Sequence, residues 1–228
     1  MALLHTFEAM ARGGVPGIQA LHRDFSPFVA HFTSFKTMIP VQDCVKSSGT
    51  PKAVAKALKI ADTQSFQCAK AILETRTIRA STPSAKDGLP RCVCLSESTL
   101  PGLVAHAERY GRFGFVFRKT DVFKAKGRPC LYLAENLYTH VDSAGEREGA
   151  SALEQELRGL SNMLCLPGFG KVQDYTHERE WRVLSDVRLD ETRPVAVVSP
   201  SGFVAPLRPL LQENTVQVPI DVFFEWGI

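Results

Sequence analysis

Two glutamates, Glu178 and Glu180, flank an arginine in the stretch DYTHEREWRV, which spans residues 174–183. Carboxylates at this spacing suit a reaction that passes through a cationic intermediate. One carboxylate can accept a hydrogen bond from a ribose hydroxyl and stabilise an oxocarbenium-like transition state, while the other orients or deprotonates the incoming nucleophile. The alternative is the solvated face of an ordinary strand, with Arg179 and Trp181 turned inward.

The position of Arg179 bears on these two interpretations. Burial of an unpaired arginine is costly, so Arg179 must meet a carboxylate or the strand must begin after it. In both cases a carboxylate lies close to Trp181. If the strand begins at Glu180, then Glu178 belongs to the preceding loop, and we favour Glu180 because it opens the apolar strand.

Polar side chains also stand at the ends of two earlier predicted strands. His31 and Thr33 lie at the end of the apolar run 28–32, and Ser96 and Glu97 end the run RCVCLSES. Each has an ordinary structural explanation, such as a core histidine or a serine bonded to backbone. A metal-dependent nuclease that uses Glu97, Glu178 and Glu180 is a further, weaker alternative.

The elements that would position these residues are short strands and helices in alternation. Many connections are too short for helical crossovers between parallel strands, which predicts an α+β fold. Periodicity predicts helices at 50–62, 65–76, 99–111, 120–127 and 143–164, and strands at 28–32, 91–98, 112–119, 128–134, 180–186, 194–200 and 216–226.

Composition sets further bounds. A chain of 228 residues with a formal net charge of +3 predicts a single domain, here with a helical insertion at about 36–65. No stretch approaches the roughly 20 apolar residues of a membrane span, so we expect a cytoplasmic protein. Six cysteines lack paired C-x-x-C spacing, so no metal site is expected, and Cys92 and Cys94 should share one face of a strand.

Taken in order along the chain, several segments resemble the ADP-ribosyltransferase superfamily, and within it the bacterial DarT-like and abortive-infection-associated proteins. Together with what lies between them they span residues 30–183. The segments are AHFTSF at 30–35, AILETRTIRAS at 71–81, VCLSES at 93–98, RYGRFGFVFRK at 109–119, RPCLYL at 128–133 and DYTHEREWRV at 174–183.

The resemblance implies a split β-sandwich of two packed sheets, with NAD bound as co-substrate in the crevice between them. His31 matches a position that hydrogen-bonds a ribose of NAD, and Phe32 and Thr33 lie beside it. Ser96 matches a position that supports the nicotinamide side. Tyr110 or Phe115 would supply an aromatic surface against the nicotinamide.

For catalysis, the resemblance implies that Glu180 engages the nicotinamide ribose. Glu178 is an additional glutamate where related enzymes use one. Arg79 is similar in placement to an arginine that contacts NAD and aids catalysis. The stretch 36–65 makes the sequence separation between His31 and Arg79 longer than in the family pattern.

The expected function is therefore that of a toxin or phage-defence ADP-ribosyltransferase, which releases nicotinamide and transfers ADP-ribose to a nucleic-acid or protein acceptor. An antitoxin is a possible partner, and no membrane partner is expected. A basic cluster at 109–128 would follow a phosphate backbone or form a solvated surface. The alternative is a non-catalytic module of the same fold that senses a nucleotide or binds an antitoxin.

Overall fold

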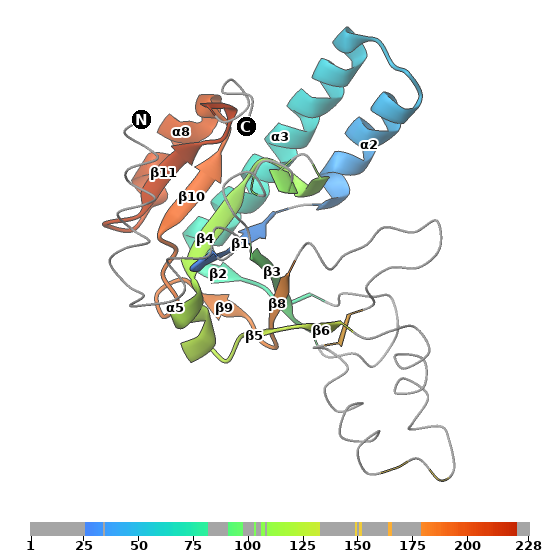
Figure 1. Cartoon of the computed structure of the whole chain (residues 1–228). Coiled ribbons are helices and arrows are strands. Elements are labelled where there is room, and N and C mark those ends of the chain that lie inside the picture. The colour runs from blue at the N-terminus through green and yellow to red at the C-terminus, as the bar shows by residue number, and fades with distance from the viewer. Residues whose placement is uncertain are drawn as a thin grey trace. The chain divides into compact units, whose positions relative to one another are not determined.

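Figure 1 presents the computed structural model of the chain. The structure describes residues 26–33, 35–81, 91–97, 103, 106–107, 109–132, 149, 151, 164–165 and 179–222. The chain divides into two compact units, each described by itself. The first unit comprises Met1–Ala71, Ser98–Thr120 and Pro194–Ile228, and the second comprises Ile72–Glu97 and Asp121–Arg193. The single-domain organisation stays a prediction.

The first unit contains a four-stranded part of a sheet. Its strands are β1 (Phe28–Phe32), β4 (Gly114–Arg118), β10 (Ala196–Ser199) and β11 (Val216–Pro219). They lie in the order β11-β10-β4-β1, with β4 antiparallel to both neighbours and β10 parallel to β11. The parallel pair is joined by the short helices η5 (Ser201–Phe203), α8 (Val204–Leu207) and η6 (Arg208–Leu210).

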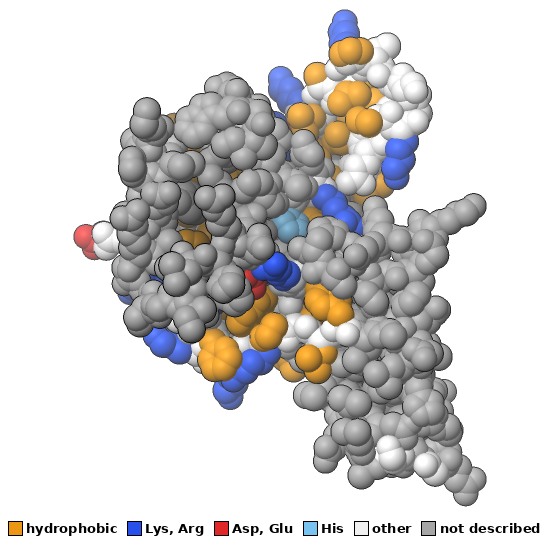
Figure 2. Space-filling model, viewed as in Figure 1, with side chains coloured by type: hydrophobic (Ala, Val, Ile, Leu, Met, Phe, Trp, Pro, Cys, Tyr) orange, Lys and Arg blue, Asp and Glu red, His pale blue; other side chains and the backbone are white. Residues whose placement is uncertain are grey.

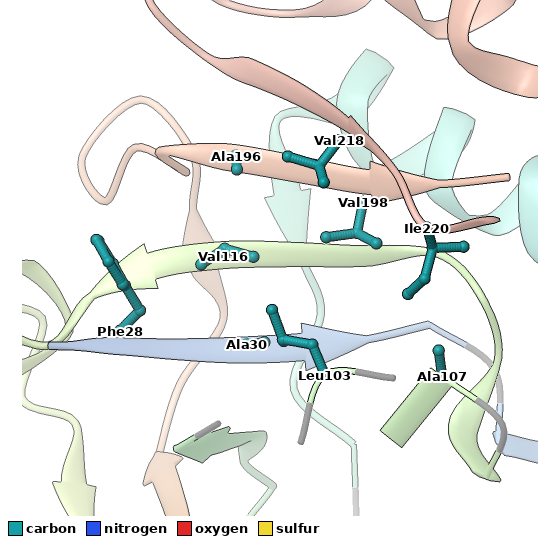
Figure 3. Close-up of a cluster of buried hydrophobic side chains, with 9 residues drawn as sticks. All are labelled: Phe28, Ala30, Leu103, Ala107, Val116, Ala196, Val198, Val218 and Ile220. Atoms are coloured by element: carbon teal, nitrogen blue, oxygen red, sulfur yellow. The ribbon is translucent and has the colours of Figure 1, made fainter. Parts of the chain in front are cut away.

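One face of this sheet is covered with apolar side chains (Figure 3). The register pairs Ala30 with Val116, and Val116 with Ala196, so these three side chains share that face. A slip of β1 by one residue would turn Phe28 and Ala30 to the other face, and burial of this cluster therefore fixes the register. Its buried members are Phe28, Ala30, Leu103, Ala107, Val116, Ala196, Val198, Val218 and Ile220.

Two helices of the first unit run side by side as a hairpin (Figure 1). They are α2 (Phe35–Lys46) and α3 (Pro51–Thr75). The backbone N–H of Ala53 donates to Thr50 Oγ1 at 3.3 Å, and Pro51 occupies the first helical position. A small apolar cluster joins the two helices, formed by Met38, Val41, Ala61, Val54, Ala57 and Leu58.

The prediction of two separate helices over 50–76 was wrong, because α3 is one helix of 25 residues. Residues 62–66 contain no glycine or proline that would interrupt it. The hydroxyl of Thr63 donates to the carbonyl oxygen of Lys59 at 2.9 Å, one turn back. A threonine that bonds within the helix in this way does not end it.

The second unit contains three further strands: β3 (Val93–Glu97), β8 (Glu180–Val183) and β5 (Arg128–Pro129). β8 lies between β3 and β5 and is antiparallel to both. Two smaller sheets accompany them, β2 (Thr77–Ile78) with β9 (Val187–Arg188), and β6 (Leu131–Tyr132) with β7 (Leu164–Cys165). Helix α5 (Lys119–Lys124) spans the end of the first unit and the start of the second.

The α+β class is confirmed, whereas several boundaries differ from the prediction. The strand predicted at 128–134 is divided at Cys130 into β5 and β6. The strand predicted at 216–226 ends at Pro219, and β9 was not predicted at all. β9 has only two residues, too few for an alternating pattern to be recognised in the sequence. The helix predicted at 143–164 lies largely outside the described residues.

Candidate active site

The paired strands β3 and β8 have one polar face and one apolar face. Ser96 lies opposite Glu180, and Cys94 lies opposite Arg182. Because side chains alternate along a strand, these four share the polar face, and Cys92 joins them from the residue before β3. The opposite face carries Val93, Leu95, Trp181 and Val183, each at most 9% exposed. The apolar face therefore anchors the strands and determines which side chains are presented on the polar face.

Glu180 is held at three points. Arg182 donates from Nε to Oε1 at 2.8 Å and from Nη2 to Oε2 at 3.1 Å, so the ion pair is bidentate. The backbone N–H of Glu180 donates to Tyr132 Oη at 2.8 Å, and its carbonyl oxygen accepts from the N–H of Cys130 at 2.7 Å. The side chains of Glu180 and Arg182 are 17% and 11% exposed. Such a carboxylate has a fixed orientation.

Both of the arrangements that the sequence allows for Arg179, a carboxylate partner and a strand that begins after it, are observed. β8 begins after it, at Glu180, and Arg179 is exposed with a positive φ of 42°. Its Nη1 lies 3.6 Å from Oε1 of Glu97, and the backbone N–H of Glu97 donates to its carbonyl oxygen at 3.2 Å. The positive φ of Arg179 shows that the extended backbone of β8 does not continue through this residue. Glu178 lies outside the described residues.

Arg79 stands apart from this polar face. It follows β2, which pairs with β9 in a separate small sheet. Its side chain is exposed and makes neither a hydrogen bond nor an ion pair with another residue that the structure describes. The structure thus brings Ser96 and Glu180 together in the second unit, and the described contacts do not tie Arg79 to them.

The remaining predicted site residues belong to the first unit. His31 and Phe32 are half-buried neighbours on β1, and they point to opposite faces of the sheet. Thr33 is 1% exposed, and both its N–H (2.9 Å) and its hydroxyl (3.4 Å) donate to the carbonyl oxygen of Phe113. Phe115 is fully buried, so between the two aromatic candidates Tyr110 is the one that a ligand could reach.

An aromatic row in the first unit brings Phe32 and Tyr110 together through a residue that was not predicted. His106 stacks on Phe32 with ring centroids 6.0 Å apart, and on Tyr110 with centroids 5.6 Å apart. The guanidinium carbon of Arg109 lies 5.1 Å from the centroid of the Tyr110 ring. The spacing of His106 and Tyr110, four residues apart on a predicted helix, is the sequence signal that could have identified this row.

Cys92 and Cys94 lie on one face of the strand, as predicted, with their sulfur atoms 3.7 Å apart. A hydrogen bond from Cys94 lowers the pKa of Cys92 below its ordinary value, and the positive charge of Arg182 lowers it further. Burial raises the pKa but does not cancel these two effects. The same hydrogen bond, together with burial and the negative charge of Glu180, raises the pKa of Cys94. Cys92 is therefore the thiol of the pair that ionises first.

Much of the basic cluster at 109–128 is engaged within the protein. Arg112 donates from Nε to Asp62 Oδ1 at 3.0 Å and from Nη1 to Asp221 Oδ1 at 2.9 Å, and it forms an ion pair with Asp62 through Nη2. Arg128 donates to the carbonyl oxygens of Phe123 and Gly127. Arg112 is thus a structural side chain rather than an open anion contact, whereas Arg128 is exposed and is bonded to the backbone through Nη1 alone.

The described part of the second unit has no cluster of carboxylates that could bind a metal ion for catalysis. Glu97 and Glu180 are on neighbouring strands but on opposite faces of the β3–β8 pair. Among the described residues, no three His, Cys, Asp or Glu side chains could together hold a metal ion. None of the helices in the described part of the chain has the length and apolar character needed to cross a membrane.

Comparison of the chain with protein-family models, with curated proteins and with solved structures found no match.

Proposed function

We propose that this protein is an NAD-dependent ADP-ribosyltransferase of the toxin or phage-defence type, with the split β-sandwich fold of that superfamily. The observation that carries the proposal is the placement of Glu180, which opens β8 opposite Ser96 and whose carboxylate is held by Arg182. The family resemblance predicts that the nicotinamide ribose is contacted by a carboxylate of this kind, which has a fixed orientation and lies at the start of a strand beside a hydroxyl group.

In the proposed reaction the bond between the nicotinamide nitrogen and the ribose anomeric carbon breaks, and nicotinamide leaves with the electron pair. Positive charge develops on the ribose, and the carboxylate of Glu180 stabilises it while accepting a hydrogen bond from a ribose hydroxyl. A carboxylate has about four acceptor positions, so a bidentate arginine is compatible with a further donor. The acceptor nucleophile bonds to the anomeric carbon, and Glu178 takes its proton.

For NAD binding we propose His31, Phe32, Thr33, Ser96 and Tyr110, with Arg79 as a catalytic contact. The aromatic row supports this assignment in part, because His106 holds the Phe32 and Tyr110 rings at fixed positions. Aromatic faces of this kind suit the planar nicotinamide ring. Thr33 would act through its backbone position, since its hydroxyl is buried and bonded to Phe113.

As acceptor we propose a nucleic acid, and the supporting side chains are Lys52, Lys56 and Lys59 on α3. At spacings of four and three residues they form one stripe, and all three are exposed. None of them forms an ion pair with another described residue. Basic and hydrophobic side chains are seen together on the α2–α3 hairpin in Figure 2.

This stripe lowers the stability of its own helix. Like charges four residues apart cost about 0.2–0.5 kcal/mol. Lys52 also lies in the first turn, where the helix dipole favours negative charge, and that turn has no acidic residue. The stripe spans about 10 Å along the axis, comparable to about three phosphates of one strand. Binding to a phosphate backbone would offset this cost.

A second candidate is a non-catalytic NAD-sensing or antitoxin-binding module of the same fold. The observation that favours it is the bidentate pair itself, because Arg182 bonds both oxygens of Glu180. If the Glu180–Arg182 ion pair serves only to stabilise β8, the protein would bind NAD without cleaving it.

The two candidates are separated by incubating the protein with NAD carrying a label in the nicotinamide ring and with single-stranded DNA or RNA. The enzyme releases labelled nicotinamide and increases the mass of the acceptor by one ADP-ribose. The module binds NAD in calorimetry and releases nothing. Absence of both binding and release, in protein with intact circular dichroism, excludes the enzyme and the NAD-sensing module.

A further inference from the structure

The polar face of the second unit contains a pair of thiols that the proposed reaction does not use. Cys92 and Cys94 have their sulfur atoms 3.7 Å apart, beside the Glu180–Arg182 ion pair. Cys92 is 1% exposed, and Cys94 is half-buried. The other described cysteines, Cys44, Cys68 and Cys130, have no sulfur–sulfur contact among the interactions seen in the structure.

The backbone around these thiols is fixed. The N–H of Cys92 donates to the carbonyl oxygen of Ser81, and the N–H of Ser81 donates to the carbonyl oxygen of Cys92, both at 2.9 Å. Cys94 pairs with Arg182 in the β3–β8 register. Two strand residues two positions apart have α-carbons roughly 6.6 Å from each other, near the upper end of the range for disulfides. The sulfurs would have to approach by a further 1.6 Å or so to bond.

We propose that Cys92 and Cys94 form a reversible disulfide when the protein meets a hydroperoxide. The bond would be strained because the strand holds the α-carbons far apart, and a strained disulfide is readily reduced. The site is therefore a redox modification site rather than a permanent crosslink. The proposal does not depend on the ADP-ribosyltransferase activity.

The reaction balances with one hydroperoxide. The thiolate of Cys92 attacks the O–O bond, which breaks. The Cys92 sulfur takes the terminal OH and becomes a sulfenic acid, and the alkoxide leaves and takes up the proton that the Cys92 thiol lost on ionising, which gives an alcohol, or water when the oxidant is hydrogen peroxide. The sulfur of Cys94 then attacks the Cys92 sulfur. The S–S bond forms, and the sulfenic hydroxyl leaves with the Cys94 proton as water. The assignment of Cys92 as the first thiolate agrees with its lowered pKa.

The test treats the folded, full-length protein with hydrogen peroxide, blocks remaining thiols with iodoacetamide and digests with trypsin. Cleavage after Arg91 and Arg109 leaves Cys92 and Cys94 in one peptide with no other cysteine. We expect this peptide to carry no alkyl group and to be about 2 Da lighter than the reduced peptide, and to recover both thiols with dithiothreitol. Exposed Cys68, which contacts no other thiol that the structure describes, should instead proceed to sulfenic and sulfinic acid.

Two results would overturn the proposal. One is a peptide that keeps both thiols at a peroxide concentration that oxidises Cys68. The other is a peptide whose cysteines become sulfinic acids or pair with other cysteines. Cys94→Ala gives a second readout, because it removes the resolving thiol. In that variant a dimedone adduct should accumulate at Cys92, and an adduct that is equally abundant in the wild type would also contradict the proposal.

Discussion

Arg182 binds both carboxylate oxygens of Glu180 from two residues further along the same strand, with Nε 2.8 Å from Oε1 and Nη2 3.1 Å from Oε2. Residues at this spacing share one face of a strand, so the pair needs no other element to form. Both side chains are largely buried, which strengthens the interaction relative to an exposed pair. The arrangement makes Arg182 a positioning residue for Glu180.

Replacement of Arg182 tests that role. Arg182→Ala removes both donors and leaves Glu180 free to rotate, and we expect kcat for nicotinamide release to fall about tenfold or more, with KM for NAD changed less than about threefold. Arg182→Lys keeps the charge but makes a single contact, so it should restore only part of kcat. A purely structural role would instead lower the melting temperature and leave the kcat of the folded fraction unchanged.

The ion pairs of Arg112 offer a stability prediction in the first unit. Arg112→Ala leaves the Asp62 carboxylate, 8% exposed, without its partner, and we expect a loss of about 3 kcal/mol in the free energy of unfolding. The matched control is Arg188→Ala, whose ion pair with Glu191 is 66% and 67% exposed and should contribute at most about 1 kcal/mol. Urea unfolding measures both. A loss of unfolding free energy for Arg112→Ala that is as small as that of Arg188→Ala, at most about 1 kcal/mol, would show that the Arg112 ion pairs contribute little to stability.

The thiol pair predicts a specific pH dependence. The pKa of Cys92 is held below its ordinary value of 9.0 by the hydrogen bond from Cys94, so the reactive thiolate should form at lower pH than in an isolated cysteine. The pH midpoint of Cys92 alkylation by iodoacetamide should therefore lie below 9.0, the ordinary value for a cysteine. In Cys94→Ala the donor is lost, and the Cys92 midpoint should move upward. A midpoint that does not move, or that moves downward, would contradict the direction of the shift.

The lysine stripe predicts how oligonucleotide binding depends on salt. In the triple variant Lys52→Glu, Lys56→Glu, Lys59→Glu, loss of about three phosphate contacts should reduce the slope of log K against log salt by about 2 for a single strand.

A comparison set of reversals with the same change of charge is Arg109→Glu, Lys124→Glu and Lys126→Glu. If the stripe is the binding surface, the slope of this set stays close to that of the wild type. A larger loss of slope in the comparison set would assign binding to the basic cluster at 109–128 instead.

Local periodicity was sufficient to predict much of the second unit's polar face. Alternation along the strand places Cys92 with Cys94. The cost of burying an unpaired Arg179 predicts that it meets a carboxylate or that β8 begins after it, and both are observed. Both inferences concern neighbours in the sequence, where the geometry of an extended chain determines which side chains share a face.

Contacts between distant segments could not be predicted in this way. The stacking of Phe32 on His106 joins a strand to a later helix, and Arg112 meets carboxylates 50 and 109 residues away. No pattern in the sequence specifies which buried charge meets which partner, because that depends on how the elements pack. For this reason the sequence left two interpretations of the basic cluster at 109–128 open, a phosphate-binding or a solvated surface, and did not predict that Arg112 and Arg128 are bonded within the protein.

Glu180 is the residue on which the proposed function depends, and its replacement by glutamine gives the most direct measurement. Glu180→Gln keeps the size of the side chain and removes its charge, so nicotinamide release from NAD should fall by on the order of 100-fold or more. Glu191→Gln, at an exposed position of the same unit, is the matched control and should retain wild-type activity. A folded Glu180→Gln variant that releases nicotinamide at the wild-type rate would contradict the proposed role of this carboxylate.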